Sequence, residues 1–128
     1  MNFDWADFLT LADALVRDPN SPGPEEASLR SAISRAYYAA FCSARNFACA
    51  KDGLVLPRPR APEVHGLVRD HFEVSHDRAR RKIGTDLNRL RDYRNRADYD
   101  DVLIRRPISL AQSSVAVARN VLNALNSL

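Results

Sequence analysis

The 128-residue sequence contains little cysteine and glycine, and each scarcity excludes a class of protein. Cys42 and Cys49 are too few for a disulfide scaffold, and seven residues apart on one helix they lie about 10 Å apart along its axis. We therefore expect two buried thiols in a cytoplasmic protein. The four glycines form no phosphate-binding glycine-rich loop. No apolar run reaches the ~18 residues of a membrane span, and the acidic N-terminal residues do not resemble a signal peptide.

The three histidines offer no metal-binding pattern. His65, His71 and His76 are separated by six and five residues, so no two of them share one helix face. The sequence also lacks a cysteine or histidine pair with the spacing of a zinc site. We expect neither a metal nor a cofactor.

The basic residues are almost all arginine and are unevenly distributed. Residues 1–29 carry six acidic residues and one basic residue, whereas residues 78–96 carry eight basic and two acidic residues. A guanidinium group donates two parallel hydrogen bonds to phosphate or carboxylate, so the second segment predicts an anion-binding face. Codon preference in a GC-rich genome is an alternative reason for the excess of arginine over lysine, but it does not explain the clustering.

Apolar periodicity predicts helices separated by proline-rich breaks at residues 18–23 and 54–61. The expected helices span residues 3–17, 24–51, 62–74 and 77–99, followed by one after Pro107 with apolar residues at 108, 111, 115, 118, 122 and 125. Gly53 is expected to end the second helix in the left-handed conformation. The inward face of the first helix is expected to hold Phe8, Leu11, Ala12 and Leu15. Residues 1–128 are therefore predicted to form one domain, an all-α up-and-down bundle of four to five helices.

The fourth predicted helix carries charged residues where its apolar face should continue. Extending the stripe at positions 83, 87 and 90 predicts that position 94 and then position 97 or 98 face inward, which are Arg94, Ala97 and Asp98. Arg91 lies one turn before Arg94. A buried arginine is costly unless it is paired or lines a cleft. One interpretation is an internal Arg94–Asp98 ion pair that secures the helix end. The other is a recessed pair of guanidinium groups that binds phosphate, with Asn95 and Tyr99 beside it.

The second predicted helix contributes Arg35, Tyr37 and Tyr38 in the segment SRAYYAAF. Tyr37 belongs to the apolar stripe and is expected in the core. Tyr38 lies on a neighbouring face, where its ring can either pack against a helix or stack on an RNA base. Arg35 and Tyr38 are therefore further candidates for contact with RNA.

Three segments together resemble the HEPN family of small helical domains: SRAYYAAFCSARNFA at residues 34–48, EVHGLVRDHF at 63–72 and LRDYRNRADYDD at 90–101. The resemblance extends over about residues 24–125. It implies a helical bundle that commonly forms homodimers and binds RNA or a nucleotide. Many members are metal-independent endoribonucleases in toxin–antitoxin or defence systems, and others pair with a nucleotidyltransferase-type antitoxin.

The sequence departs from the catalytic signature of that family, which is an arginine and then a histidine after four to six intervening residues. Arg94 and Asn95 match the beginning of the signature, but positions 99–101 hold tyrosine and two aspartates. Histidine suits proton transfer near neutral pH. Asp98 beside Arg94 is a weak base, and Tyr99 is protonated at pH 7. We therefore expect binding to be retained and nuclease activity to be weak or lost.

The leading hypothesis is a homodimeric RNA- or nucleotide-binding domain whose phosphate contacts come from Arg91, Arg94, Asn95, Arg35 and Tyr38. The dimer is suggested by the resemblance and by the long apolar stripe of the last helix, which one bundle is not expected to cover fully. One alternative is a metal-independent endoribonuclease toxin that uses Arg94 with Asp98 or Tyr99. Another is a protein-interaction subunit that pairs with a nucleotidyltransferase.

Overall fold

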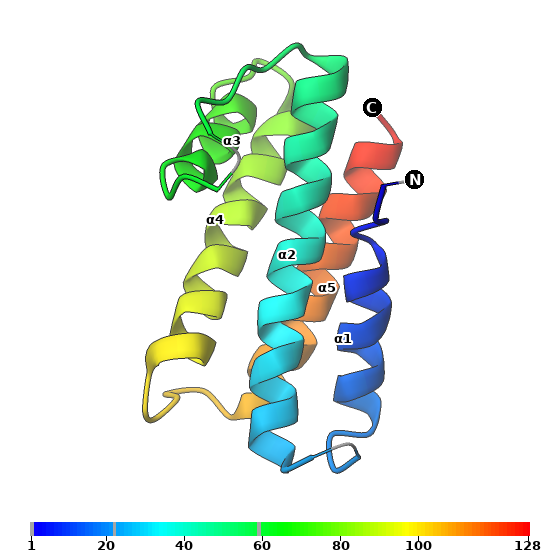
Figure 1. Ribbon diagram of the computed structural model, residues 1–128, viewed down its shortest axis with the longest axis vertical. Coiled ribbons are helices and arrows are strands. Elements are labelled where there is room, and N and C mark those ends of the chain that lie inside the picture. Colours follow the sequence, from blue (N-terminus) through cyan, green and yellow to red (C-terminus); the bar gives the residue numbers. More distant parts are fainter. Residues whose placement is uncertain (1, 22, 59) are drawn as a thin grey trace.

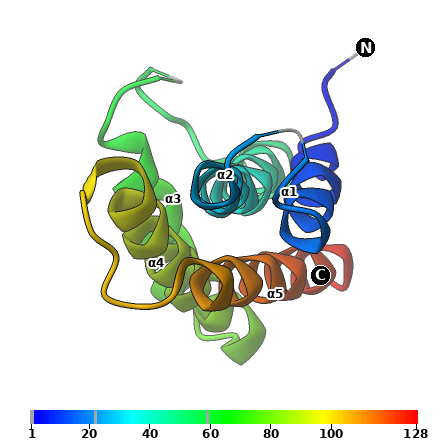
Figure 2. The same cartoon turned by 90° about the horizontal axis from the view of Figure 1, so that it is seen from below.

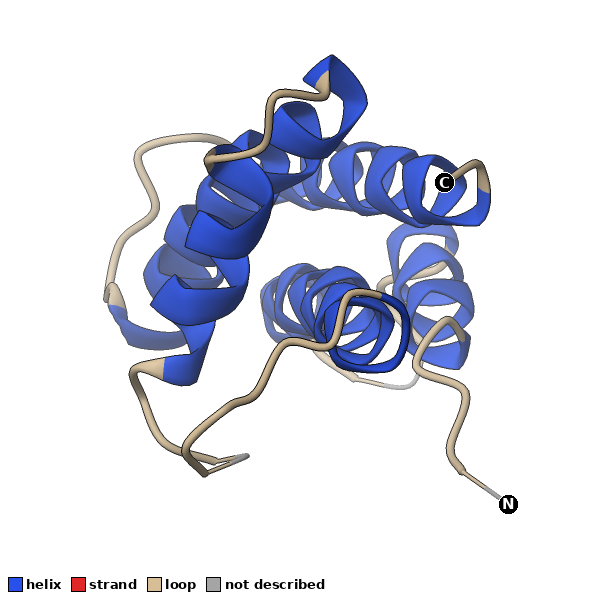
Figure 3. Ribbon diagram, turned by 90° about the horizontal axis from the view of Figure 1, so that it is seen from above, coloured by secondary structure: helices blue, strands red, loops and turns tan. Residues whose placement is uncertain are grey.

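The computed structural model describes residues 2–21, 23–58 and 60–128, which form five helices and no strand (Figures 1 and 3). The helices are α1 (Asp7–Arg17), α2 (Glu25–Lys51), α3 (Val64–Glu73), α4 (Arg78–Tyr99) and α5 (Pro107–Asn126). The prediction of an all-α, up-and-down bundle is confirmed: α1, α2, α4 and α5 alternate in direction, and the short α3 lies against α4 (Figure 1). Pro22 and Pro59, which belong to the predicted breaks, lie outside the described residues. None of the described helices is both long enough and apolar enough to cross a bilayer.

Helix α2 lies at the centre of the bundle and contacts each of the other four helices (Figure 2). Its contact faces are lined by small, fully buried residues: Ala32, Ala36, Ala39, Ala40, Ala44 and Ala48. Alanine favours the helical conformation, and its short side chain allows neighbouring helices to approach closely. Larger buried side chains, including Leu29, Ile33 and Tyr37, fill the remaining space.

Local sequence signals set the helix ends. Pro24 is the N-cap of α2, which therefore begins at Glu25, one residue later than predicted, and Pro107 is the first residue of α5. Asp77 caps α4, because its Oδ2 accepts a hydrogen bond of 3.2 Å from the backbone N–H of Arg80. Gly53 follows α2 with a φ of 71°, which confirms the predicted left-handed conformation.

The C-terminal end of α4 is fixed to α2 by Arg30. Its guanidinium group donates hydrogen bonds to the carbonyl oxygens of Ala97 at 3.0 Å and Asp100 at 2.6 Å, and it pairs with Glu26 at 3.0 Å. Carbonyl groups at a helix end have no intrahelical partner, so a cation there both satisfies them and complements the helix dipole. This contact positions the turn that carries the candidate site.

Two predictions about burial are wrong. Leu11 is exposed, whereas Leu9 is buried beside Ala12 in α1, which itself begins at Asp7 rather than at residue 3. Cys42 is buried as expected, but Cys49 is exposed. Each misplaced side chain is adjacent in sequence to a buried alanine, Ala12 or Ala48, and a step of one residue turns it by about 100° toward solvent.

Most of the apolar stripe of α5 is covered within a single chain. Helix α5 packs against α1, α2 and α4, and positions 111, 115, 118 and 125 of the stripe are buried, whereas positions 108 and 122 are half-buried. The stripe is therefore not fully covered, as expected, but two half-buried positions do not by themselves require a dimer.

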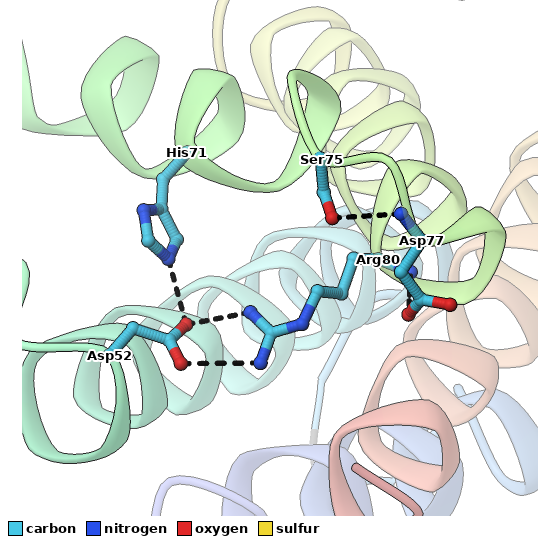
Figure 4. Close-up of polar contacts among 5 residues, drawn as sticks. All are labelled: Asp52, His71, Ser75, Asp77 and Arg80. Carbon is cyan, nitrogen blue, oxygen red and sulfur yellow. Dashed lines mark hydrogen bonds and ion pairs between the residues drawn. The ribbon is translucent and has the colours of Figure 1, made fainter.

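Asp52, directly after α2, joins α2 to both α3 and α4 (Figure 4). Its Oδ2 accepts hydrogen bonds from Nε2 of His71 at 2.8 Å and from Nη1 of Arg80 at 2.7 Å. Its Oδ1 accepts one from Nη2 of Arg80 at 3.2 Å. The hydrogen bonds from Arg80 lower the pKa of Asp52 below its ordinary value, so the carboxylate is charged at neutral pH.

We predict that Asp52→Asn lowers the free energy of unfolding by about 1–2 kcal/mol at pH 7. Because the pKa of Asp52 is lower in the folded chain, the contribution of its carboxylate is present above about pH 4 and is lost as pH falls through the lowered pKa. Urea unfolding followed by circular dichroism should therefore show a smaller difference between variant and wild type at pH 3 than at pH 7. Asp18→Asn, in the exposed α1–α2 connection, is the control. An equal loss of unfolding free energy in Asp52→Asn and Asp18→Asn would contradict the stabilising role assigned to the Asp52 carboxylate.

Candidate functional site

Arg94 on α4 connects this helix to the tyrosines of α2. Its Nη1 donates a hydrogen bond of 3.3 Å to the hydroxyl group of Tyr38. Its Cζ atom lies 5.6 Å from the ring centres of both Tyr37 and Tyr38, and its Nη1 lies 3.6 Å from Oδ2 of Asp98. The side chain of Arg94 is 13% exposed, so the arginine is recessed as the sequence predicted.

Both interpretations of the α4 arginines describe part of the structure. The predicted Arg94–Asp98 ion pair is present, but at 3.6 Å it is long. The Nε atoms of Arg91 and Arg94 are buried and have no hydrogen-bond partner among the described residues. Unlike Arg94, Arg91 forms no ion pair with a carboxylate among the described residues. A buried N–H group without an acceptor is costly, so both arginines retain unmet hydrogen-bonding capacity.

Tyr37 is buried in the core as predicted, and its hydroxyl group forms a short hydrogen bond with Nδ1 of His65 on α3. The imidazole ring of His65 stacks on Phe41, with 4.4 Å between the ring centres. Sequence reasoning missed His65 as a member of this site. No sequence signal identifies it, because Tyr37 lies 28 residues away and the pairing depends on how α3 packs against α2.

The surroundings of His65 fix its charge and its tautomer. Burial, and then the charges of Arg91 and Arg94, lower the pKa of His65 to about 4, so the ring is neutral at pH 7. Burial raises the pKa of Tyr37, which therefore keeps its proton. Among the described residues the Tyr37 hydroxyl group has no hydrogen-bond acceptor other than Nδ1, so we assign it as the donor to His65. The proton of the neutral imidazole then lies on Nε2, where it is available to an acceptor.

The predicted phosphate-binding residues line two separate pockets. Arg91 and Asn95 line an open pocket of about 420 Å³ on α4. Arg35 and Tyr38 line a second pocket, of about 650 Å³, to which His65 also contributes. Arg94 contacts the second pocket through the hydroxyl group of Tyr38.

The three residues considered for catalysis do not assemble around one point. Tyr99 is 75% exposed, and no hydrogen bond in the described part of the chain joins it to Arg94. Asp98 forms a long ion pair with Arg94, with 3.6 Å between Nη1 and Oδ2. His65 is the nearest histidine, but with a pKa of about 4 it is a weak base at neutral pH. Among the described residues, no group of three histidine, cysteine or acidic side chains is arranged to hold a metal ion.

We predict that Arg91→Gln raises the pKa of His65, because removal of a nearby positive charge makes the imidazolium form less unfavourable. A pH titration followed by the NMR signals of the imidazole ring measures this value directly. Arg89→Gln, an exposed position on the same helix, is the matched control. If the pKa of His65 stays near 4 in Arg91→Gln, or rises equally in both variants, the assigned closeness of Arg91 to His65 is contradicted.

Comparison with family models matches residues 24–128 to a family described as HEPN domain. The matched range contains α2, α3, α4 and α5, and with them every predicted site residue, whereas α1 lies outside it. Searches of curated proteins and of solved structures give no significant match.

Proposed function

The chain belongs to the HEPN domain family, and on this basis we propose that it binds RNA through phosphate contacts on α4. The observation that carries the proposal is the open pocket of about 420 Å³ on α4 that Arg91 lines, because no carboxylate among the described residues forms an ion pair with this arginine. Phosphate oxygens are strong acceptors, and arginine is the side chain best suited to bind them bidentately.

The residues that line the pocket beside Arg91 favour binding of a phosphate over binding of a neutral ligand. It is lined by Arg89 as well as Arg91, and by the side-chain amides of Asn88 and Asn95. Its one acidic residue, Asp92, is already paired with a neighbouring arginine at 3.1 Å. Arginine and amide groups are typical contacts to the RNA or DNA backbone, and they position a strand without reading its sequence.

The same geometry favours binding over cleavage. Cleavage by attack of a 2′-hydroxyl group needs a side chain that exchanges a proton near neutral pH. Asp98 is paired with Arg94, Tyr99 is exposed, and His65 has a pKa of about 4. We therefore infer an RNA-binding domain that leaves its bound RNA intact.

The predicted consequence is that Arg91→Gln weakens binding to RNA of any sequence. Loss of one phosphate contact should also make the plot of log K against log salt shallower by about 1. Fluorescence anisotropy with a labelled single-stranded RNA, measured over about 50–200 mM salt, gives both the affinity and its dependence on salt. Gel analysis of the recovered RNA should show intact strands.

Arg78→Gln is the matched control, because this exposed arginine opens α4 at the end opposite to the pocket. Its affinity and salt slope should remain close to those of the wild type. An unchanged affinity and salt slope in Arg91→Gln would contradict the proposed phosphate contact. Cleaved RNA would contradict a pure binding function and support the nuclease alternative.

We also propose that the chain acts as a homodimer, through the connection that follows α4 rather than through α5. Three large apolar side chains are exposed within six residues: Tyr99 is 75%, Val102 81% and Ile104 94% exposed. A cluster of exposed apolar residues is typical of a surface that another molecule covers. Pairing through this surface is consistent with the dimers that are common in the family.

Light scattering coupled to size-exclusion chromatography should give the wild type twice the 14.4 kDa mass of one chain. Ile104→Asp should shift the mass to that of one chain, because a buried carboxylate opposes association. Val55→Asp, at an exposed valine on the other long connection, should leave the dimer intact. A monomeric wild type, or a dimer that survives Ile104→Asp, would refute this interface.

A further inference from the structure

The α4–α5 connection carries negative charge beside its exposed apolar side chains. Its residues 99–104 read Tyr-Asp-Asp-Val-Leu-Ile, and the tyrosine, the valine and the isoleucine are the exposed cluster described above. Asp100 and Asp101 are exposed as well, and among the described residues neither carboxylate forms an ion pair or accepts a hydrogen bond. A surface that covers this connection must therefore offer both apolar area and positive charge.

The backbone of the connection is held in place by Arg30. Its guanidinium group donates hydrogen bonds to the carbonyl oxygens of Asp100 at 2.6 Å and Asp101 at 3.4 Å. These bonds use backbone oxygens and leave both carboxylates free. A segment that is already ordered loses less conformational entropy when it binds, so the connection is suited to dock as a preformed element.

The pocket of about 650 Å³ between α1, α2 and α3 has the complementary charge. Three of its lining residues are arginines, and none of the described lining residues is acidic: the arginines are Arg35, Arg45 and Arg60. Within the described part of the chain, no carboxylate forms an ion pair with any of the three. The positive charge of the pocket is consequently not neutralised by the chain itself.

The other walls of this pocket are largely aromatic and include Trp5, Phe8 and Tyr38. The Cζ atom of Arg35 lies 4.7 Å from the ring centre of Phe8 and 5.3 Å from that of Tyr38, and the Cζ atom of Arg45 lies 5.7 Å from that of Trp5. Such cation–π contacts occupy the face of a guanidinium group and leave N–H groups at its edge for a carboxylate. The pocket thus combines apolar walls with free positive charge.

The connection cannot fill the pocket of its own chain. It lies at one end of the bundle, whereas the α2–α3 connection, which supplies Arg60, lies at the other end (Figure 1). Helices α4 and α5 hold both of its ends, and Arg30 holds its backbone between them. Any such connection in the pocket must therefore come from a second molecule.

We propose that the pocket receives the α4–α5 connection of a second copy of this chain. The apolar side chains of the connection would pack against the aromatic walls, and the carboxylates of Asp100 and Asp101 would pair with the arginines. The inference rests on the homodimer proposed above, and it assigns the surface that covers the connection. Each copy carries one connection and one pocket, so reciprocal docking in a dimer leaves neither unfilled.

Membership of the family does not imply this mode of pairing. Trp5 and Phe8 precede residue 24, where the match with the family begins, so one wall of the receiving pocket comes from residues outside the match. Trp5 is also the single tryptophan of the sequence. Its fluorescence therefore reports on occupation of the pocket.

The test reverses one charge on each side of the proposed contact. Asp101→Arg sets an arginine against the basic pocket, and Arg60→Asp sets a carboxylate against the acidic connection. Each variant alone should dissociate, with its dimer dissociation constant raised at least about tenfold. Mixed in equal amounts, the two variants should form a dimer again, because the connection of each then meets a pocket of opposite charge in the other. Analytical ultracentrifugation measures these masses.

Arg58→Asp is the matched control, because Arg58 is exposed on the same connection as Arg60 but does not line the pocket. It should remain a dimer. The docking proposal is overturned, while the proposed dimer stands, if Arg60→Asp stays dimeric although Ile104→Asp dissociates. It is also overturned if the mixture of Asp101→Arg and Arg60→Asp stays monomeric. A monomeric wild type overturns both proposals.

Trp5 fluorescence gives a second readout on the unaltered chain. Dissociation of the wild-type dimer by dilution should change the emission of Trp5, because it removes the connection of the partner from the pocket. Emission that stays constant while the mass halves would overturn the proposal. A Trp5 signal that responds to single-stranded RNA and not to dissociation would also overturn it, and would assign the pocket to RNA instead.

Discussion

The structure depends on one constraint, which is that α2 must contact four helices at once. Its alanines allow the close approach, but the longer polar side chains of α2 must then find their partners on the helices around it. Arg30 binds the carbonyl groups at the end of α4, Tyr37 bonds to His65 of α3, and Tyr38 accepts a hydrogen bond from Arg94. The candidate site is therefore a consequence of the packing around α2, and not a feature added to its surface.

This packing concentrates positive charge that the protein does not fully offset. Arg91 and Arg94 face Tyr37 and His65, which are both neutral at pH 7 because burial disfavours their charged forms. The carboxylate of Asp98 lies 3.6 Å from Arg94, and Asp92 beside Arg91 is paired with Arg96. An isolated guanidinium group in a half-buried position is expensive to maintain. An anion that accepts the free N–H groups would recover part of that cost, and this is the physical reason to assign the site to phosphate.

The sequence predicted what depends on local periodicity and missed what depends on contacts between helices. Proline, glycine and apolar spacing placed all five helices, and the inward position of Arg94 followed from the stripe of its own helix. Leu11 was misplaced because a stripe predicts a face only to within about one residue. His65 and Arg30 were missed for a different reason. Their partners lie 28 and 67 residues away, and no periodic pattern encodes which side chains meet across an interface.

The two pockets are distinct in their lining but share one connection, the hydrogen bond between Arg94 and Tyr38. The ring of Tyr38 lies between two cations, since the Cζ atoms of Arg35 and Arg94 are 5.3 Å and 5.6 Å from its centre. A phosphate that draws the guanidinium group of Arg94 toward the pocket of Arg91 would weaken its contact with Tyr38 and change the electrostatic environment of Arg35. A ligand that packs against Tyr38 in the second pocket would act on Arg94 through the same contact. Such coupling is necessarily reciprocal, so if the two sites influence one another, each ligand must change the affinity for the other by the same factor.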